Sequence, residues 1–241
     1  MSGPESNLAR VIHLQPTAPL AERVLLPGDP GRALLLAQSL LEAPKMFNHN
    51  RGLWGYTGAA PDGELLTIQS TGMGGPSAAI VISELAELGA ARLIRVGTCG
   101  ALEPGLALGD LLIASDAIPA DGTSRALGAS ARVPGSQELL EAMPALVAGT
   151  VVSTDLFYDD RPEVEEQWIA AGAQAVDMEV ATLYTLAWRR RVQAAAILIV
   201  SDTLRPRRSR IGEEALRKAE QRLGEAALSA LTPQLRRQSV P

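Results

Sequence analysis

Cysteine and histidine are scarce in this chain of 241 residues. Cys99 is the only cysteine, so the chain cannot form an intrachain disulfide. With only two histidines, His13 and His49, a zinc site made of His and Cys ligands is not expected either. Apolar runs of the roughly 18 residues that cross a bilayer are missing, and the N-terminal residues lack both a basic start and an apolar signal core. These absences predict a cytoplasmic protein.

An excess of positive charge is missing as well. The chain has 22 Lys and Arg against 27 Asp and Glu, which gives a net charge of -5 and a pI near 5.2. A general nucleic-acid binder usually needs a basic face, so that class is disfavoured, although a few local arginines can still bind a small anion. Since 46% of the residues are hydrophobic and 22 are glycine, the chain can bury a substantial core.

Apolar runs alternate with helical spacing along most of the chain, which predicts one mixed α/β domain with a sheet covered by helices. Strands are expected at Arg23–Leu26, Leu53–Gly58, Leu65–Ser70, Arg92–Gly97, Asp110–Ile118, Thr150–Thr154, Ala175–Asp177 and Ala194–Ser201. Helices are expected at Arg32–Leu41, Pro76–Gly89, Gln137–Val147, Arg161–Ala171, Met178–Arg190 and Glu213–Leu231. The Gly, Ala and Ser-rich residues 119–136 are interpreted as a surface excursion, and Pro233–Pro241 as a frayed tail beyond a core of about 11–232.

Most of the unusual polar residues follow the carboxyl end of a predicted strand, where open α/β sheets bind their ligands. The segments are Gly28–Arg32, Thr71–Gly75, Thr98–Gly100 and Ser201–Asp202. The glycines allow a close approach of the backbone to a ligand, and the helix that begins near Arg32 offers free N–H groups to an anion. Taken alone, an ordinary strand-to-helix turn with a surface arginine explains the first segment at least as well.

Arg95 interrupts the predicted apolar strand Arg92–Gly97. A buried charge without a partner is costly, so Arg95 needs either an acidic partner or a bound anion. Thr98 follows three residues later and adds a hydroxyl and an N–H group. We favour an anion site here, with a structural ion pair as the alternative.

Two carboxylates, Glu179 and Asp202, stand at the ends of predicted elements. Glu179 is expected in the first turn of a helix, whose dipole favours an ionised carboxylate that can accept hydrogen bonds from the two hydroxyls of a ribose. Asp202 ends an apolar strand and is expected to be partly desolvated, which favours a protonated form. The structural alternatives are a helix-terminal charge for Glu179 and a cap, or a pair with a nearby arginine, for Asp202. The arginines that follow Asp202 are Arg205, Arg207, Arg208 and Arg210.

Phe157 and Tyr158 place two of the eight aromatic residues side by side, in the loop after the predicted strand Thr150–Thr154. An aromatic ring at this strand end could stack on a flat heterocycle, whereas core packing is the alternative for at least one of the two.

Six short motifs occur one after another along the chain. They are Pro27–Arg32, Asn50–Gly52, Arg95–Gly100, Ser153–Tyr158, Asp177–Glu179 and Val200–Asp202. In this order they resemble the hexameric nucleoside phosphorylases, namely bacterial purine nucleoside phosphorylase, uridine phosphorylase and archaeal methylthioadenosine phosphorylase. The resemblance covers roughly residues 11–232 and implies a partly barrel-like mixed sheet surrounded by helices. It also implies a homo-oligomer, a hexamer built as a trimer of dimers.

The resemblance assigns roles to individual positions. Phosphate would be bound by Gly28, Arg32, Arg95 and Thr98, together with Arg51 from a neighbouring subunit. The ribose would be held by Glu179, packed by Met178, and reached at its 5′ position by His13 of an adjacent subunit. The base would stack on Phe157 and meet Ser201 and Asp202, with Asp202 as the general acid. Phosphate is then the nucleophile, and neither a metal nor an organic cofactor is needed.

The base end of the site distinguishes the members of the family. A Ser-Asp pair at 201–202 resembles the purine enzymes, whereas uridine phosphorylases carry a Gln-x-Arg in the loop that follows Phe-Tyr. Here that loop, Tyr158–Glu163, has no glutamine and has acidic residues instead. A purine nucleoside phosphorylase is therefore expected, with uridine or methylthioadenosine phosphorylase as the alternatives.

Two further rivals share the fold. A nucleosidase attacks with water and would not need Arg32, Arg51 and Arg95 together, and a non-catalytic nucleoside-binding relative should have lost Asp202 or Glu179. The purine enzymes also place an arginine well after the aspartate to assist protonation. Several arginines compete for that role here, and Arg217 is our candidate.

Overall fold

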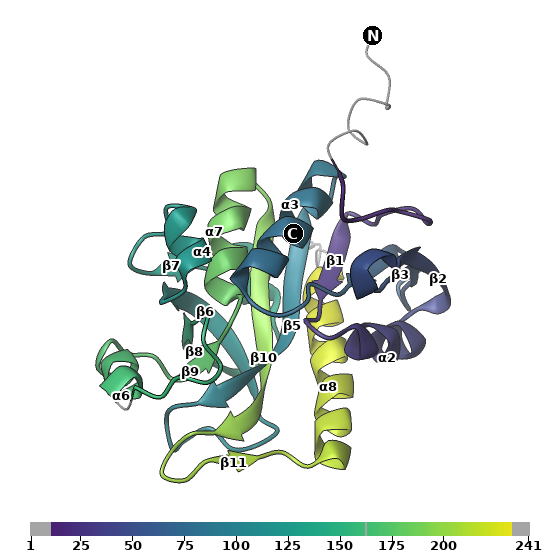
Figure 1. Ribbon diagram of the computed structural model, residues 1–241. Helices are drawn as coiled ribbons and strands as arrows, with labels where there is room; N and C mark the ends of the chain where they lie inside the picture. Colours follow the sequence, from purple (N-terminus) through teal and green to yellow (C-terminus); the bar gives the residue numbers. More distant parts are fainter. Residues whose placement is uncertain (1–10, 162, 233–241) are drawn as a thin grey trace, which may run out of the picture.

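The computed structural model describes residues 11–161 and 163–232, which form helices around one large sheet (Figure 1). The strands are β1 (Arg23–Leu26), β2 (Glu42–Asn48), β3 (Gly55–Ala59), β4 (Leu65–Gln69), β5 (Arg92–Ala101), β6 (Leu111–Pro119), β7 (Val133–Pro134), β8 (Val147–Ser153), β9 (Ala175–Asp177), β10 (Gln193–Thr203) and β11 (Ser209–Arg210). The helices are α2 (Pro30–Leu40), η1 (Asn50–Gly52), α3 (Gly75–Glu87), α4 (Gly122–Ala126), α5 (Gln137–Ala142), α6 (Glu163–Ala170), α7 (Val180–Arg190) and α8 (Glu213–Leu231). The expected tail, 233–241, lies outside the described residues.

Five strands close on themselves. The order β10-β6-β8-β9-β5 is completed by a parallel pairing between β5 and β10, while β1, β4, β3 and β2 extend the sheet from β5. Parallel and antiparallel pairings both occur, for example between β6 and β8 and between β10 and β6. The prediction of a single mixed α/β domain with a partly barrel-like sheet is confirmed.

Strand β10 is buried on both of its faces. Its residues alternate between two cores: Ala194, Ala196, Leu198 and Val200 face one, and Ala195, Ile197 and Ile199 face the other. Helices α3 and α7 cover the first core, while α2, α5 and α8 cover the second. A strand that is apolar on both sides has no alternation of hydropathy, which is why its sequence reads as one continuous apolar run.

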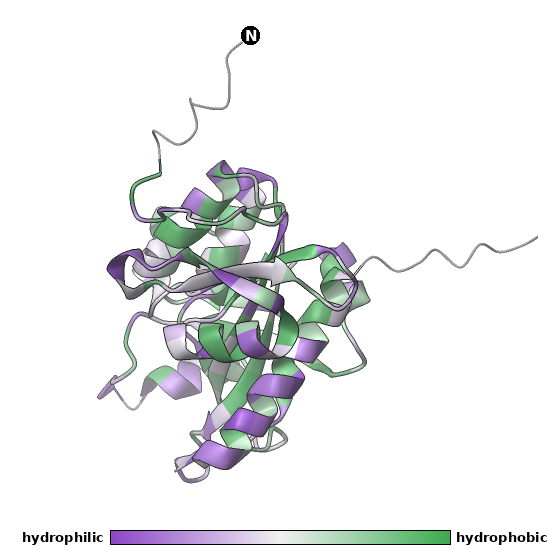
Figure 2. Ribbon diagram, turned by 90° about the vertical axis from the view of Figure 1, so that its right-hand side faces the viewer, coloured by the Kyte–Doolittle hydropathy of each residue, from purple (hydrophilic) through white to green (hydrophobic). Residues whose placement is uncertain are grey.

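Helix α8 packs one stripe of residues on the sheet and on α2. The buried positions follow a spacing of three and four residues: Ala219, Glu220, Leu223, Gly224, Ala227, Ala230 and Leu231. Figure 2 views the side of the molecule that carries α2 and α8 in Figure 1, and hydrophilic and hydrophobic residues alternate along these helices. One member of the buried stripe, Glu220, is charged.

Two expectations for individual elements need correction, and one strand was missed. The helix expected over Gln137–Val147 ends at Ala142, because Pro144 cannot continue it, and Val147 already begins β8. Residues 119–136 are not merely a surface excursion: they contain α4, and the side chains of Asp121 and Ser124 within them are fully buried. Strand β2 was not expected, since its first five residues are exposed and show no apolar alternation.

The hairpin of β3 and β4 is confirmed, with five residue pairs in antiparallel register. No helix of the described residues is long and apolar enough to cross a bilayer.

Candidate active site

A cavity of about 820 Å³ opens where β1, β5, β9 and β10 end. It brings together nine of the residues singled out from the sequence: Gly28, Arg32, Arg95, Thr98, Phe157, Met178, Glu179, Ser201 and Asp202. These residues come from positions up to 174 apart in the chain, and the parallel strands β1, β5 and β10 deliver many of them to one edge. The expectation that the polar strand ends converge is confirmed.

Arg95 lies at the base of this cavity and is only 6% exposed. Its Nε donates to Asp177 at 3.1 Å, and one terminal amino group is paired with Glu179. Burial alone would lower the pKa of Arg95, but the two carboxylates outweigh it and raise the pKa above its ordinary value. The guanidinium is therefore a permanent positive charge inside a buried environment.

The third nitrogen of Arg95, Nη1, is buried and has no hydrogen-bond partner among the described residues. A Cβ on Gly28 would lie 3.9 Å from it, so Nη1 faces the loop that follows β1. A buried donor without a partner is rare in folded proteins, and an anion between Gly28 and Arg95 would satisfy it. The ion pair weighed as the alternative from the sequence is therefore present, and it leaves Nη1 of the same guanidinium unpaired.

Asp177 organises this part of the site, a role that the sequence did not reveal. Besides Arg95 it accepts the hydroxyl of Ser153 at 2.6 Å and the backbone N–H groups of Glu179 and Val180 at 3.0 Å each. It is 4% exposed. One carboxylate therefore caps α7 and fixes the direction of Arg95 at the same time.

Glu179 stands at the N-cap of α7 and is 5% exposed. Its Oε1 accepts the N–H of Gly74 at 2.6 Å and its Oε2 is paired with Arg95. Burial raises the pKa of Glu179, and the charge of Arg95 opposes this rise. A carboxylate has about four lone-pair sites, so these two contacts leave room for further hydrogen bonds from a ligand.

Two glycine-containing loops, after β1 and after β4, line the cavity beside Arg95. The N–H of Thr71 donates to Pro27 and that of Gly72 donates to Gly28, at 2.9 and 3.0 Å. A Cβ on Gly28 would meet the Gly72 carbonyl at 3.1 Å, so the absence of a side chain permits this close approach. Gly72 and Gly74 both have positive φ angles, of 73° and 83°, which other residues rarely adopt.

Arg32 enters the cavity from α2 and is 9% exposed. Its Nε donates to Glu220 of α8 at 2.7 Å, a contact between residues 188 positions apart. The interpretation of Arg32 as a surface arginine on a turn is therefore wrong, because the residue is buried and faces the cavity.

Asp202 and Ser201 line the cavity from the end of β10. Asp202 is 9% exposed, and its carboxylate accepts the Ser201 hydroxyl at 2.8 Å. Its Cα is paired in register with that of Arg210 across β10 and β11. The partly desolvated position expected for Asp202 is confirmed.

Aromatic and basic side chains border the remaining wall. Phe157 is 49% exposed, and the guanidinium of Arg208 lies 5.5 Å from its ring centre. Arg208 and Arg210 both line the cavity. Arg217 does not: its side chain on α8 is 70% exposed and lies 3.7 Å from Glu213, one turn earlier. Its role in catalysis stays a prediction.

His13 and Arg51, expected to act in a neighbouring subunit, do not line the cavity of their own chain. They lie in adjoining segments, since the Asn50 side chain donates to the His13 carbonyl at 2.9 Å. The imidazole Nδ1 of His13 is 2.7 Å from Glu84 of α3, which also accepts three consecutive backbone N–H groups, from residues 12 to 14. Arg51 adopts a left-handed conformation, with φ of 59°.

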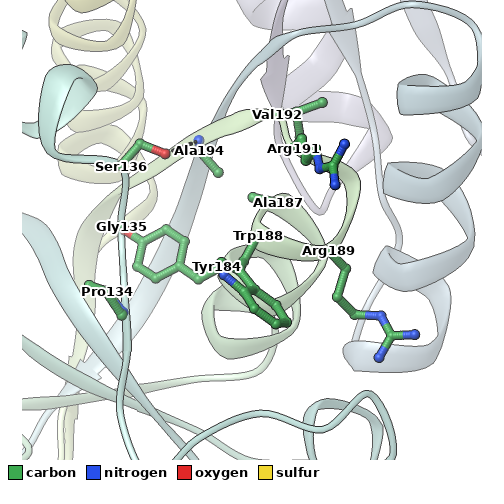
Figure 3. A pocket seen from close by; sticks show the side chains of 10 residues that line it. All are labelled: Pro134, Gly135, Ser136, Tyr184, Ala187, Trp188, Arg189, Arg191, Val192 and Ala194. Carbon is green, nitrogen blue, oxygen red and sulfur yellow. Dashed lines mark hydrogen bonds between the residues drawn. The ribbon is translucent and has the colours of Figure 1, made fainter.

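A second cavity, of about 750 Å³, lies at the opposite end of β10, beside Ala194 (Figure 3). Its lining includes Trp188, Arg189 and Arg191 from the C-terminal end of α7 but no carboxylate. None of the residues singled out from the sequence as site residues lines it. Since the two cavities have similar volumes, the clustered charges, rather than size, identify the first one as the candidate active site.

Comparison with known proteins shows the family to which the chain is similar. A family model described as the phosphorylase superfamily matches residues 22–232. A purine nucleoside phosphorylase, DeoD-type, of Caldanaerobacter subterraneus subsp. tengcongensis is 41% identical over 196 residues, covering 77% of this chain and 84% of that protein. A protein of the same description from Jannaschia sp. is 39% identical over 212 residues, with 83% and 88% covered. Among solved structures, uridine phosphorylase from Vibrio fischeri ES114 is similar with a TM-score of 0.78 and 28% identity, covering 88% of this chain and 91% of that one.

Proposed function

The chain belongs to the phosphorylase superfamily, and from that membership we propose that it is a purine nucleoside phosphorylase. It is a pentosyltransferase: it transfers the pentose of a purine ribonucleoside or deoxyribonucleoside to inorganic phosphate. The products are the free base and the pentose 1-phosphate.

The observation that carries this function is the placement of Arg32, Arg95 and Glu179 around one cavity. Two guanidinium groups with unused nitrogens provide charge-assisted donors for a phosphate dianion, between the Gly28 loop and Thr98. Glu179 is bound to Arg95 directly, so a ribose held by its carboxylate lies next to that phosphate. The nucleophile and the anomeric carbon are thereby brought together.

Cleavage of the glycosidic bond builds positive charge on the sugar and negative charge on the departing base. Phosphate beneath the sugar stabilises the first charge and then bonds to the anomeric carbon. The buried arginines hold the phosphate in place before the reaction, and preorganised charge of this kind is usually a large catalytic contribution. In this proposal the residues of the chain and phosphate suffice, with no metal or organic cofactor.

The negative charge on the base requires a proton. Asp202 is the general acid in our proposal, delivering a proton to N7 of the purine, and Ser201 orients its carboxylate through the 2.8 Å hydrogen bond. Phe157 stacks on the base, and Met178 packs against the sugar. The loop that follows Phe157 contributes Asp159, Asp160 and Arg161 to the cavity and holds no glutamine, which supports a purine rather than uridine.

We further propose a homo-oligomer, a hexamer in which each site is completed by its neighbour. His13 and Arg51 lie on adjoining segments outside their own cavity, an arrangement suited to reaching the ribose and the phosphate of a second subunit. The proposed His13 contact depends on the imidazole being held by Glu84, which leaves Nε2 free to point outward.

The test is a substrate panel of inosine, adenosine, guanosine, methylthioadenosine and uridine, each with and without phosphate. We expect base release from purine nucleosides that depends on phosphate and yields pentose 1-phosphate. Release at the same rate without phosphate would show a nucleosidase, and preference for uridine would reassign the base.

A further inference from the structure

Glu220 is a buried carboxylate that the chemistry above does not use. It stands in the apolar stripe of α8, between Ala219 and Leu223 on the buried face, and its side chain is 10% exposed. A carboxylate in such a place is costly unless it is paired, and its partner is the Nε of Arg32 at 2.7 Å. We propose that Glu220 is a positioning residue, which holds Arg32 in the orientation that binds phosphate. The inference rests on the proposed function of the site.

The packing of α8 on α2 explains how Glu220 reaches Arg32. One turn after Glu220 stands Gly224, where a Cβ would lie 2.6 Å from the Leu36 side chain and 3.1 Å from that of Leu40. The two helices therefore approach closely at this glycine. Leu36 is one turn after Arg32 on α2, so the same contact places Glu220 and Arg32 opposite each other.

Glu220 binds one nitrogen of Arg32, and this determines which nitrogens remain available to bind an anion. A guanidinium presents two usable edges to an oxyanion, one with Nε and one with the two terminal amino groups. Glu220 occupies Nε, and no hydrogen bond links the terminal groups to another of the residues that the structure describes. Because Arg32 lines the cavity, its terminal edge is left for a bidentate contact with phosphate.

Arg95 is arranged in the same way, which makes the pattern more than a chance ion pair. Its Nε is held by Asp177, its Nη2 by Glu179, and Nη1 is left without a partner beside Gly28. Arg32 and Arg95 are thus each fixed through Nε by a carboxylate from another element of the fold. A long side chain that is already immobilised loses less conformational entropy when the ligand arrives.

The experiment compares phosphate binding in the wild type, Glu220→Ala and Glu220→Gln, with Glu225→Ala as a control on the exposed face of the same helix. Phosphate binding is measured without nucleoside, as the rise in melting temperature with phosphate concentration, and in turnover as the KM for phosphate. We expect Glu220→Ala to raise the apparent Kd and KM for phosphate about three- to tenfold, with the nucleoside KM at saturating phosphate unchanged. Glu220→Gln keeps a neutral acceptor for Nε, and we expect a rise of about two- to threefold. Glu225→Ala should match the wild type.

The double variant Arg32→Ala with Glu220→Ala tests whether Glu220 affects phosphate binding through Arg32. If Glu220 acts through Arg32, removing it in the Arg32→Ala background changes phosphate binding no further. Unchanged phosphate binding in Glu220→Gln overturns the proposal even where Glu220→Ala does not fold. Tighter phosphate binding in either variant also overturns it, since Glu220 would then be a competing anion. A wild type that binds phosphate but releases no base would refute the proposed function while leaving the role of Glu220 testable.

Discussion

Gly97 has no side chain to contribute, yet we expect that replacing it with alanine disables the proposed phosphate site. Arg95 folds back over Gly97: a Cβ at that position would lie 2.8 Å from Cζ and from Nη2 of Arg95, and 3.1 Å from Nε. An ordinary contact begins at 3.4 Å, so the guanidinium would have to move by about 0.6 Å.

Arg95 has little freedom to make that movement. Its Nε and Nη2 are bound to two buried carboxylates, and the rest of the side chain is enclosed by the sheet. Overpacking of this kind costs about 1–3 kcal/mol. If this cost is borne by the contact between Arg95 and phosphate in the transition state, kcat/KM for phosphate falls about 5- to 150-fold.

The assay is steady-state phosphorolysis of inosine at varied phosphate concentration, with melting temperatures to show that the variant is folded. Gly105→Ala is the matched control, because a Cβ there meets nothing within 4 Å, and it should stay within about twofold of the wild type. A folded Gly97→Ala enzyme with wild-type kcat/KM for phosphate would refute the assignment of Arg95 to the phosphate.

Three other predictions test separate parts of the molecule. Asp202→Asn should lower kcat on purine nucleosides by about 100-fold or more while the nucleoside KM is largely retained, and unchanged turnover would remove Asp202 from the mechanism. Arg51→Ala and Asp202→Asn, each impaired alone, should regain activity when co-expressed, because a mixed pair of subunits restores one complete site; activity no higher than that of the parents would place Arg51 elsewhere. Asp62 is bound by both terminal amino groups of buried Arg23, which lowers the pKa of this carboxyl from 3.8 to about 2. The ionised Asp62 therefore contributes its full share to the free energy of unfolding above pH 3.8, and this share is lost as the pH falls through about 2. In urea titrations we expect Asp62→Asn to be destabilised by at most about 2 kcal/mol at pH 7, with the difference vanishing near pH 2. An equal difference at both pH values would contradict the ion-pair explanation.

The sequence predicts most of the fold because each core strand and helix has its own local pattern. The expected bounds of α8 match those observed, and the continuous apolar run of β10 was interpreted correctly as a buried strand. Strand β2 escaped prediction because it is exposed over five of its seven residues, so its pairing with β3 leaves no imprint on hydropathy. Strand β11 has only two exposed residues and has no periodicity to detect.

For the site, the sequence identifies the residues that line the candidate cavity better than the residues that hold those side chains in position. Arg95 stood out because a charge interrupted an apolar strand, but its partner Asp177 lies 82 residues away, and Glu220 lies 188 residues from Arg32. Such pairings depend on which strands and helices become neighbours, and no local pattern encodes that. For the same reason, the sequence could not tell that Arg208 and Arg210, rather than the candidate Arg217, line the cavity. Only the path of the chain through β11 shows which of these arginines reach it.

Hydrogen bonds join the loop after β1 to Glu179, the carboxylate proposed to hold the ribose. Gly28 accepts the N–H of Gly72, Gly74 in the same loop donates to Glu179, and Glu179 is paired with Arg95. The residues proposed to bind phosphate and those proposed to bind the nucleoside are therefore connected by hydrogen bonds and an ion pair. If bound phosphate changes the affinity for nucleoside by some factor, then bound nucleoside changes the affinity for phosphate by the same factor. The Kd for phosphate therefore depends on whether nucleoside is bound, and the Kd for nucleoside depends on whether phosphate is bound.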